Sequence, residues 1–294
     1  MTNKPKYNRR TAVKKGILLT ALAGMQPLTG FMAPPRPHAY RIGACDWSIG
    51  QASDPEAFRV AKEIGLDGVQ VSLGNVSNNM HLRRKEVQQT YLQTSKDTQV
   101  RIASLAIGEL NNVPYKSDPV TEEWVEDSID VAKALGCQVI LLAFFGKGDL
   151  REDEEGKKEV IRRLQKVAPK AEKQDIYLAL ESWLSAEEHL RIIEAVGSSH
   201  VKVYYDVANS TEMGYDIFKE MKLLGTEYIC EIHAKENGQL LGKGKVDFGR
   251  VKNTLQEIGY KDWVIMEGAI PPGGDMLTAY QANLAYLRRV LNNQ

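Results

Sequence analysis

Four ionisable residues in the second half of the chain each end a short apolar run. They are Glu181 in LALES, Asp206 in VKVYYD, His233 in ICEIH and Glu267 in VIMEG. Because apolar residues precede each of them, we expect all four side chains to be largely buried. Buried charges repel one another and lose their hydration unless a cation joins them. Three carboxylates and one imidazole suit a divalent ion such as Mn²⁺, Zn²⁺, Co²⁺ or Mg²⁺, so the pattern predicts a site for one such ion.

Each of these residues has a simpler explanation when it is taken alone. An acid after a strand often caps a turn or a helix, and Asp206 is in such a position. His233 alone would more often be a hydrogen-bonded histidine of the core. Four such residues at the ends of consecutive apolar runs favour a shared metal site over four separate explanations.

Eight strand-like runs, separated by amphipathic stretches, must position these residues. The runs are YRIGACDWSI, GVQVSLG, VRIASLAIG, VILLAFFG, IYLALESW, VKVYYDVAN, YICEIHAKE and WVIMEG. Apolar residues at helical spacing follow the runs, and several of these stretches end at glycine, which predicts a helix after each strand. Eight such units in about 250 residues are typical of a TIM barrel, whose functional groups lie at the C-terminal ends of the strands. The predicted fold is therefore α/β, with a single (β/α)₈ TIM barrel over residues 40–294.

An open, doubly wound sheet is the alternative α/β architecture. It usually has fewer strands and a G-x-G-x-x-G turn after the first of them. The segment CDWSIGQASD, which follows the first run here, lacks that motif. No linker or change of composition divides residues 40–294, so we expect one domain there.

The first 35 residues have the composition of an export signal. A basic stretch that includes Arg9, Arg10 and Lys14 precedes the apolar run GILLTALAGM, and small residues and prolines follow. The paired arginines resemble a twin-arginine signal, which exports folded proteins, so we expect residues 1–35 to direct the protein to the periplasm. A flexible tail or a membrane anchor is the alternative, although the apolar run is too short to span a bilayer.

The distribution of charge limits the classes of partner. Residues 1–35 contain six Lys and Arg and no acid, which leaves 32 basic and 38 acidic residues in the remainder. An acidic barrel argues against binding to nucleic acid. The three cysteines, Cys45, Cys137 and Cys230, have no metal-ligand spacing, and an odd number argues against a disulfide framework. We expect buried free thiols.

Around the four ionisable residues the chain resembles a known family. The segments YYDVANS, IHAKENGQLLGKGKVDF and VIMEG, with separations of 25, 27 and 34 residues between the four positions, are similar to the xylose isomerase-like TIM barrels, a family of sugar phosphate isomerases and epimerases. The resemblance covers about residues 40–290. It implies that the four residues bind a metal ion, as in the D-tagatose 3-epimerase and L-xylulose-5-phosphate 3-epimerase branches. It also implies that Glu181 and Glu267 act as catalytic acid and base.

Three further residues are predicted to contact the substrate. Asn209 follows Asp206 by three residues, where epimerases of free ketoses usually carry histidine, and asparagine resembles the pentulose-phosphate branch more. Lys235, two residues beyond His233, is expected to point toward ligand oxygens. Trp183 is expected to form an apolar wall under a sugar ring, and a position in the core is the alternative for it.

Four other polar residues lie on or near the predicted strands. His81 and Glu109 follow the second and third strands, either at the mouth of the barrel or in solvent. Alternation along the strands places Glu231 and Lys202 inside the barrel, where we expect them to pair in a structural role.

The predicted function is that of a divalent-metal-dependent sugar isomerase or epimerase, which acts on a keto-sugar through an enediolate. Glu181 and Glu267, three strands apart in the ring, would remove and return a proton from different sides. The alternatives are a lyase or hydrolase-like enzyme for 3-keto-glycosides, an endonuclease IV-like DNA repair enzyme, and a non-catalytic sugar-binding barrel. Predicted export favours an unphosphorylated substrate, since sugar phosphates are mainly intracellular. The expected partner is a small carbohydrate, and a homo-oligomer is left open.

Overall fold

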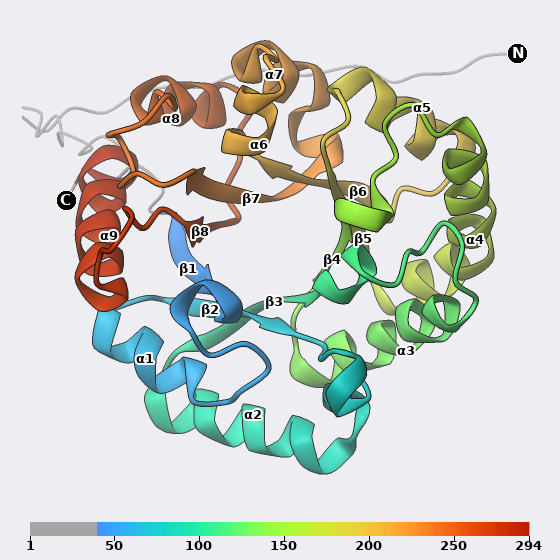
Figure 1. Ribbon diagram of the computed structural model, residues 1–294, viewed down its shortest axis with the longest axis horizontal. Helices are drawn as coiled ribbons and strands as arrows, with labels where there is room; N and C mark the ends of the chain where they lie inside the picture. The colour runs from blue at the N-terminus through green and yellow to red at the C-terminus, as the bar shows by residue number, and fades with distance from the viewer. Residues whose placement is uncertain (1–39, 294) are drawn as a thin grey trace, which may run out of the picture. The chain divides into compact units, whose positions relative to one another are not determined.

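A closed ring of eight parallel strands forms the centre of the protein (Figure 1). The computed structural model describes residues 40–293, and the predicted export segment, residues 1–35, lies outside them. The strands follow one another around the ring in sequence order, and β8 pairs with β1. The single TIM barrel predicted from the sequence is thereby confirmed. The strands are β1 (Arg41–Cys45), β2 (Gly68–Ser72), β3 (Arg101–Ile107), β4 (Val139–Phe144), β5 (Tyr177–Ser182), β6 (Val201–Asp206), β7 (Ile229–Glu236) and β8 (Trp263–Gly268).

Helices surround the ring on its outside (Figure 1). The α-helices are α1 (Ala57–Ile64), α2 (Lys85–Thr98), α3 (Val120–Leu135), α4 (Glu154–Gln174), α5 (Ala186–Val196), α6 (Val207–Glu212), α7 (Ile217–Tyr228), α8 (Phe248–Glu257) and α9 (Met276–Asn292). Short 3₁₀ helices follow several strands. They are η1 (Asp46–Ile49), η2 (Val76–Asn78), η3 (His81–Arg83), η4 (Gly108–Asn111) and η5 (Gly146–Gly148).

Local side chains explain where many of the helices begin and end. Ser185 and Glu188 form a capping box at the start of α5, in which each side chain accepts a hydrogen bond from the other's backbone N–H. Asp247, the N-cap of α8, accepts a hydrogen bond from the backbone N–H of Arg250 in the first turn. Gly65 and Gly136 adopt the left-handed conformation and end α1 and α3, as predicted.

Alternation along the strands divides the apolar residues between two layers. In β4, Ile140 and Leu142 belong to the layer shared with the surrounding helices. Leu141 and Ala143 point the other way and join a second cluster with Ile265, which fills the inside of the ring. The same alternation turns selected polar residues inward, and the parallel order brings the C-terminal ends of all strands to one rim.

The prediction that Lys202 pairs with Glu231 is wrong. In the register of β6 and β7, Tyr204, two residues beyond Lys202, lies opposite Glu231. Lys202 Nζ instead donates to the carbonyl oxygen of Glu227 and lies 4.9 Å from the ring centre of Tyr177. The Glu231 carboxylate is buried and lies near the side chains of Ser104 and Tyr204. Its burial raises the pKa of Glu231 to about 7.

The three cysteines agree with a further expectation from the sequence. Cys45, Cys137 and Cys230 are buried free thiols. Burial raises the pKa of the Cys137 thiol to about 12, which keeps it protonated at neutral pH. Within residues 40–293, no helix has both the length and the apolar character needed to cross a membrane.

Candidate metal centre

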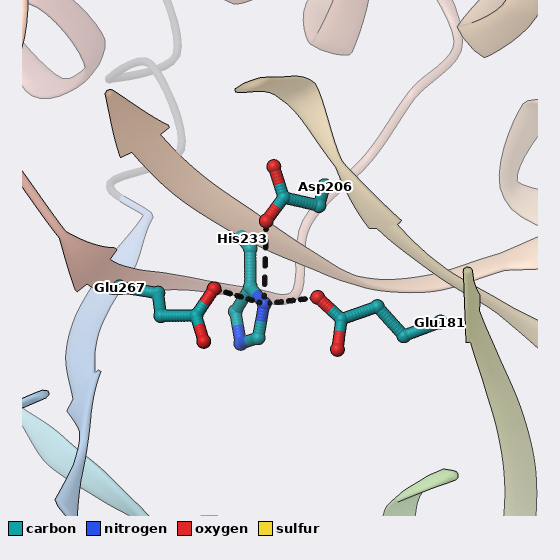
Figure 2. Close-up of side chains that lie close together, drawn as sticks. All are labelled: Glu181, Asp206, His233 and Glu267. Atoms are coloured by element: carbon teal, nitrogen blue, oxygen red, sulfur yellow. Dashed lines mark hydrogen bonds and ion pairs between the residues drawn. The ribbon is translucent and has the colours of Figure 1, made fainter. Parts of the chain in front are cut away.

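The C-terminal ends of four consecutive strands bring the four predicted ligands together. Glu181 lies on β5, Asp206 ends β6, His233 lies on β7 and Glu267 lies on β8. One possible ligand atom from each of them lies within 4.8 Å of the corresponding atoms of the other three. Figure 2 shows the four side chains pointing toward one another from separate strands. Their role as metal ligands stays a prediction, and the geometry is compatible with it.

The Nδ1 atom of His233 lies at the centre of this cluster (Figure 2). It is 2.8 Å from Oε1 of Glu181, 3.6 Å from Oε2 of Glu267 and 3.8 Å from Oδ2 of Asp206. The imidazole is fully buried, while Glu181 and Asp206 expose only 4% and 3% of their surface. Three carboxylates held so close together, two of them nearly out of contact with water, require compensating positive charge.

The two carboxylate oxygens of Asp206 have different surroundings. Oδ1 accepts hydrogen bonds of 2.8 Å from the backbone N–H groups of Ala208 and Asn209 and so caps α6. Oδ2 is buried within the cluster and has no hydrogen-bond partner among the described residues. Asp206 is therefore a helix cap through one oxygen, and its other oxygen is available to a cation. A buried oxygen of this kind, beside two more carboxylates and an imidazole, fits a divalent ion.

The charged groups of the site shift one another's pKa values. Burial alone would lower the pKa of His233, but the carboxylates of Glu181 and Glu267 raise it to about 9. Burial raises the pKa of Asp206 to about 7, against the effect of the Lys235 ammonium. For Glu267, burial would raise the pKa, but the charges of His233 and Lys235 lower it to about 2. At neutral pH, Glu267 is therefore ionised and His233 carries a proton that must leave before Nδ1 can bind a cation.

A buried polar network lies behind His233. The Nε2 atom of His233 is 3.0 Å from Oε1 of Gln70 and 3.4 Å from Sγ of Cys45. The Gln70 amide donates in turn to Oγ of Ser104 over 3.0 Å. An amide oxygen at this position accepts a hydrogen bond from Nε2–H, which leaves Nδ1 directed at the carboxylates. The one sequence signal for Gln70 is a polar residue within the apolar strand GVQVS.

Two side chains, one from η1 and one from β7, hold the carboxylate of Glu267. The indole Nε1 of Trp47, in η1, donates to Oε1 over 2.9 Å. Lys235 Nζ donates to Oε2 over 2.9 Å and lies 3.7 Å from Oδ2 of Asp206. Lys235 therefore lies beside the carboxylates of Glu267 and Asp206, and its predicted contact with the substrate stays a prediction. Trp47 is not apparent as a site residue in the sequence, because its contact depends on closure of the ring between β1 and β8.

The cluster opens into a cavity of about 440 Å³. Five residues proposed from the sequence line it, namely Glu181, Trp183, Asn209, Lys235 and Glu267. Glu109 lines it too, whereas His81 packs edge-on against Tyr91 with 6.2 Å between ring centres and does not line it.

A larger cavity, of about 550 Å³, lies at the opposite ends of the strands. Residues such as Arg41, Lys202 and Trp263, which are near the strand starts, line it. None of the four clustered residues contributes to it. Functional groups of parallel barrels lie at the C-terminal ends, so the smaller cavity is the candidate active site.

A TIM barrel with acids and a histidine clustered at its C-terminal rim is the class of protein that the fold and the site define. The chain matches the model of the xylose isomerase-like TIM barrel family over residues 58–290 and belongs to that family, as its sequence motifs predicted. The L-ribulose-5-phosphate 3-epimerase UlaE of Shigella flexneri is 25% identical over 226 residues, which are 70% of this chain and 78% of that epimerase.

Solved structures of sugar epimerases have the same fold. A D-psicose 3-epimerase, in a structure determined in the presence of D-fructose, has a TM-score of 0.73 at 17% identity and covers 86% of this chain and 99% of its own. The 3-keto-D-glucoside 4-epimerase YcjR of E. coli has a TM-score of 0.71 at 18% identity and covers 85% and 99%. At these identities the likeness shows the fold alone.

We predict that the affinity for a divalent ion rises with pH. The pKa of His233 is about 9 in the metal-free protein, so below that pH an ion must displace the imidazole proton. The apparent affinity for Mn²⁺ should therefore rise about tenfold per unit from roughly pH 7 and level off near pH 9. Isothermal titration calorimetry in buffers of different ionisation enthalpy measures both affinity and proton release. His233→Ala should abolish both, and stoichiometric binding by this variant would remove His233 from the site.

A second prediction concerns Gln70. Gln70→Leu keeps the volume of the side chain but removes the acceptor for His233 Nε2–H, so the imidazole loses its fixed orientation. We expect affinity for Mn²⁺ to fall about 10-fold to 100-fold, while ¹⁵N chemical shifts of His233, recorded above the pKa of about 9 where the imidazole is neutral, reveal a mixture of tautomers. The matched control is Gln93→Leu, on the exposed face of α2. If both variants bind Mn²⁺ like the unaltered protein, the amide does not orient the imidazole.

Proposed function

We propose that the protein is a divalent-metal-dependent epimerase that acts on an unphosphorylated keto-sugar through an enediolate. The observation that carries this proposal is the pair of carboxylates, Glu181 and Glu267, which reach one cavity from β5 and β8. Asp206 and His233, on the two strands between them, complete a set of groups that fits a divalent ion. Membership of a family that includes sugar epimerases supports the class of reaction.

The groups around the cavity can divide the transfer of a proton between them. A bound divalent ion would polarise the substrate carbonyl and stabilise the negative charge of the enediolate. Glu267 is ionised at neutral pH because His233 and Lys235 lower its pKa, so it suits removal of the proton next to the carbonyl. Trp47 and Lys235 each bind one of its oxygens and orient the carboxylate before substrate enters. Glu181, from β5, would return a proton from another side and invert the carbon.

The charges that line the cavity support a substrate without phosphate. Among the described lining residues, Lys235 is the only cation, and it is already paired with Glu267 at 2.9 Å. The other charged groups are the carboxylates of Glu109, Glu181 and Glu267. A phosphate dianion would meet net repulsion there, whereas hydroxyl groups would find acceptors.

Two segments outside the cavity have groups of a kind that can bind phosphate, namely the start of α9 and a pair of lysines after β7. At the start of α9, Asp275 already accepts a hydrogen bond of 2.9 Å from the backbone N–H of Thr278, and its charge would oppose an anion there. Lys243 and Lys245 do not line the cavity. Export through residues 1–35, which we also propose, would further separate the enzyme from sugar phosphates in the cell.

A second candidate function is a lyase or hydrolase-like reaction on 3-keto-glycosides. The same proton removal next to a carbonyl can expel a substituent one carbon further on instead of inverting a centre. The fold similarity to a 3-keto-D-glucoside 4-epimerase favours keeping this candidate. A DNA repair activity is not favoured, because the cluster contains one histidine and residues 36–294 carry more acidic than basic groups.

Exchange of hydrogen with solvent tests the proposed chemistry. The Mn²⁺-loaded protein in D₂O should place deuterium next to the carbonyl of free ketoses and 3-keto-glucosides, as read by NMR. Glu267→Gln should lower this exchange about 10²-fold to 10⁴-fold, since the base is lost. Glu181→Gln should suppress the epimer more strongly than the exchange. The control is Glu257→Gln on the exposed side of α8, and absence of exchange with every keto-sugar offered would refute the proposed function.

Competition between matched substrates tests the proposal that the substrate carries no phosphate. The protein without residues 1–35 is offered free ketoses together with their phosphate esters, for example D-ribulose and D-ribulose 5-phosphate. We expect the free sugar to have the higher kcat/KM, since the lining offers no unpaired cation among the described residues. A hundredfold preference for the ester, roughly 2.7 kcal/mol in transition-state binding, would restore a sugar-phosphate epimerase assignment.

A further inference from the structure

The half of the cavity opposite the candidate ligands has no part in the chemistry proposed above. The ligands lie on β5 to β8, so in a closed ring the loops after β2, β3 and β4 form the facing wall. These loops contribute Asn75, Glu109, Asn111 and Phe145 to the lining, and Trp183 after β5 continues it. Polar and aromatic groups therefore face the cavity at a place where the reacting carbon does not lie.

The cavity is larger than a single sugar ring requires. Its volume is about 440 Å³. A hexose has about 12 heavy atoms, and if each of them occupied roughly the 30 Å³ of a water molecule in the liquid, the sugar would fill about 360 Å³. Bonded atoms pack more closely than that, so the real volume is smaller. A monosaccharide at the metal centre would thus leave space beside the loops after β3 and β4.

The carboxylate of Glu109 is a free acceptor in that space. Glu109 is half-buried in η4, and within residues 40–293 no side chain or backbone group hydrogen-bonds or ion-pairs with its carboxylate. The cation of the cavity, Lys235, is held by Glu267. A carboxylate in this setting favours a ligand that offers neutral hydroxyl donors and disfavours an anionic one.

The loops that carry Glu109 and Phe145 are fixed against each other. Oδ1 of Asn111 accepts a hydrogen bond of 2.8 Å from the backbone N–H of Phe145. A Cβ atom at Gly148 would lie 2.8 Å from the carbonyl oxygen of Leu110, so the close approach of η4 and η5 requires glycine there. The acid and the aromatic ring are thereby held in a defined relation before any ligand binds.

Two aromatic rings form an apolar wall in the same region. The centres of Phe145 and Trp183 are 5.0 Å apart at an interplanar angle of 72°. The Arg151 guanidinium stacks 4.5 Å from the ring centre of Trp183 and is itself bound by Asp149 over 2.7 Å. The hydroxyl of Tyr215 donates to the backbone oxygen of Trp183 over 3.1 Å. An apolar wall of fixed orientation beside a few polar groups is typical of small-molecule sites.

We propose that Glu109, Asn111, Phe145 and Trp183 form a distal subsite for a second, uncharged sugar ring, linked glycosidically to the ring that reacts at the metal centre. The inference rests on the proposed function and narrows its substrate class to keto-disaccharides and related glycosides. The C–H face of the distal ring packs on Phe145 and Trp183, and its hydroxyl groups donate to Glu109. A phosphate at this place would face the Glu109 carboxylate.

Matched substrates of two sizes test the subsite. The probes are the 3-keto derivatives of trehalose and cellobiose, each compared with the methyl 3-keto-glucoside of the same anomeric configuration. The Mn²⁺-loaded protein should show at least tenfold higher kcat/KM for deuterium exchange with one of the disaccharides. Glu109→Gln, which keeps the size of the side chain, should reduce that preference about tenfold through KM, or about 1.4 kcal/mol. The control Glu63→Gln, on the exposed face of α1, should leave the preference unchanged.

A direct binding measurement separates the subsite from the reaction. Isothermal titration calorimetry with unoxidised trehalose, cellobiose and the methyl glucosides needs no turnover. A disaccharide that binds more tightly than the methyl glucoside, and whose binding is weakened by Glu109→Gln, would support the subsite. This result would hold even if no keto-sugar exchanged hydrogen. Equal binding and equal kcat/KM for both sizes of sugar would overturn it, as would a Glu109→Gln effect of the same size on the methyl glucosides. Stronger binding of an aminated or phosphorylated disaccharide would overturn the claim that the distal ring is uncharged.

Discussion

The convergence of three carboxylates on one buried imidazole is the constraint around which the rest of the site is arranged. Glu181 and Asp206 are buried and Glu267 is mostly so, and water therefore stabilises the three negative charges too little to separate them. Closure of the ring imposes their meeting, because β5 to β8 are parallel neighbours whose C-terminal ends share one rim. The protein must therefore supply positive charge, and His233 and Lys235 supply part of it. A divalent ion would balance the negative charge that these two residues leave uncompensated.

The residues around the cluster reduce the freedom of its members. Trp47 and Lys235 each donate a hydrogen bond to one oxygen of Glu267, and Gln70 accepts one from Nε2 of His233. The result is a set of donor atoms whose directions are fixed by contacts with other strands. Across the cavity, η4 and η5 are equally constrained. The site thus consists of a charged half and a half with few charges, and the closed sheet holds both in place.

The sequence predicted the barrel and the approach of the four residues, since both follow from short-range patterns. Alternating strands and helices determine the architecture, and a polar residue at the end of an apolar run shows which rim it reaches. Gln70 and Trp47 could not be found in this way. Their partners are 163 and 220 residues away, so the contacts depend on the register of the closed ring. The mistaken pairing of Lys202 with Glu231 has the same origin, because the register of β6 against β7 sets Tyr204, two residues beyond Lys202, opposite Glu231.

The double role of Asp206 has an evolutionary consequence. One oxygen of this residue starts α6 and the other points into the charged cluster. Under the proposed function, most replacements would harm folding and chemistry together, so selection on either property would preserve both. Asparagine is the exception, because it has nearly the shape of aspartate. Its side-chain oxygen can still cap α6, but it carries no charge. A lineage that abandoned catalysis but kept the barrel could pass through that single substitution, and an asparagine at this position in an otherwise intact barrel would be the signature of such a retired enzyme.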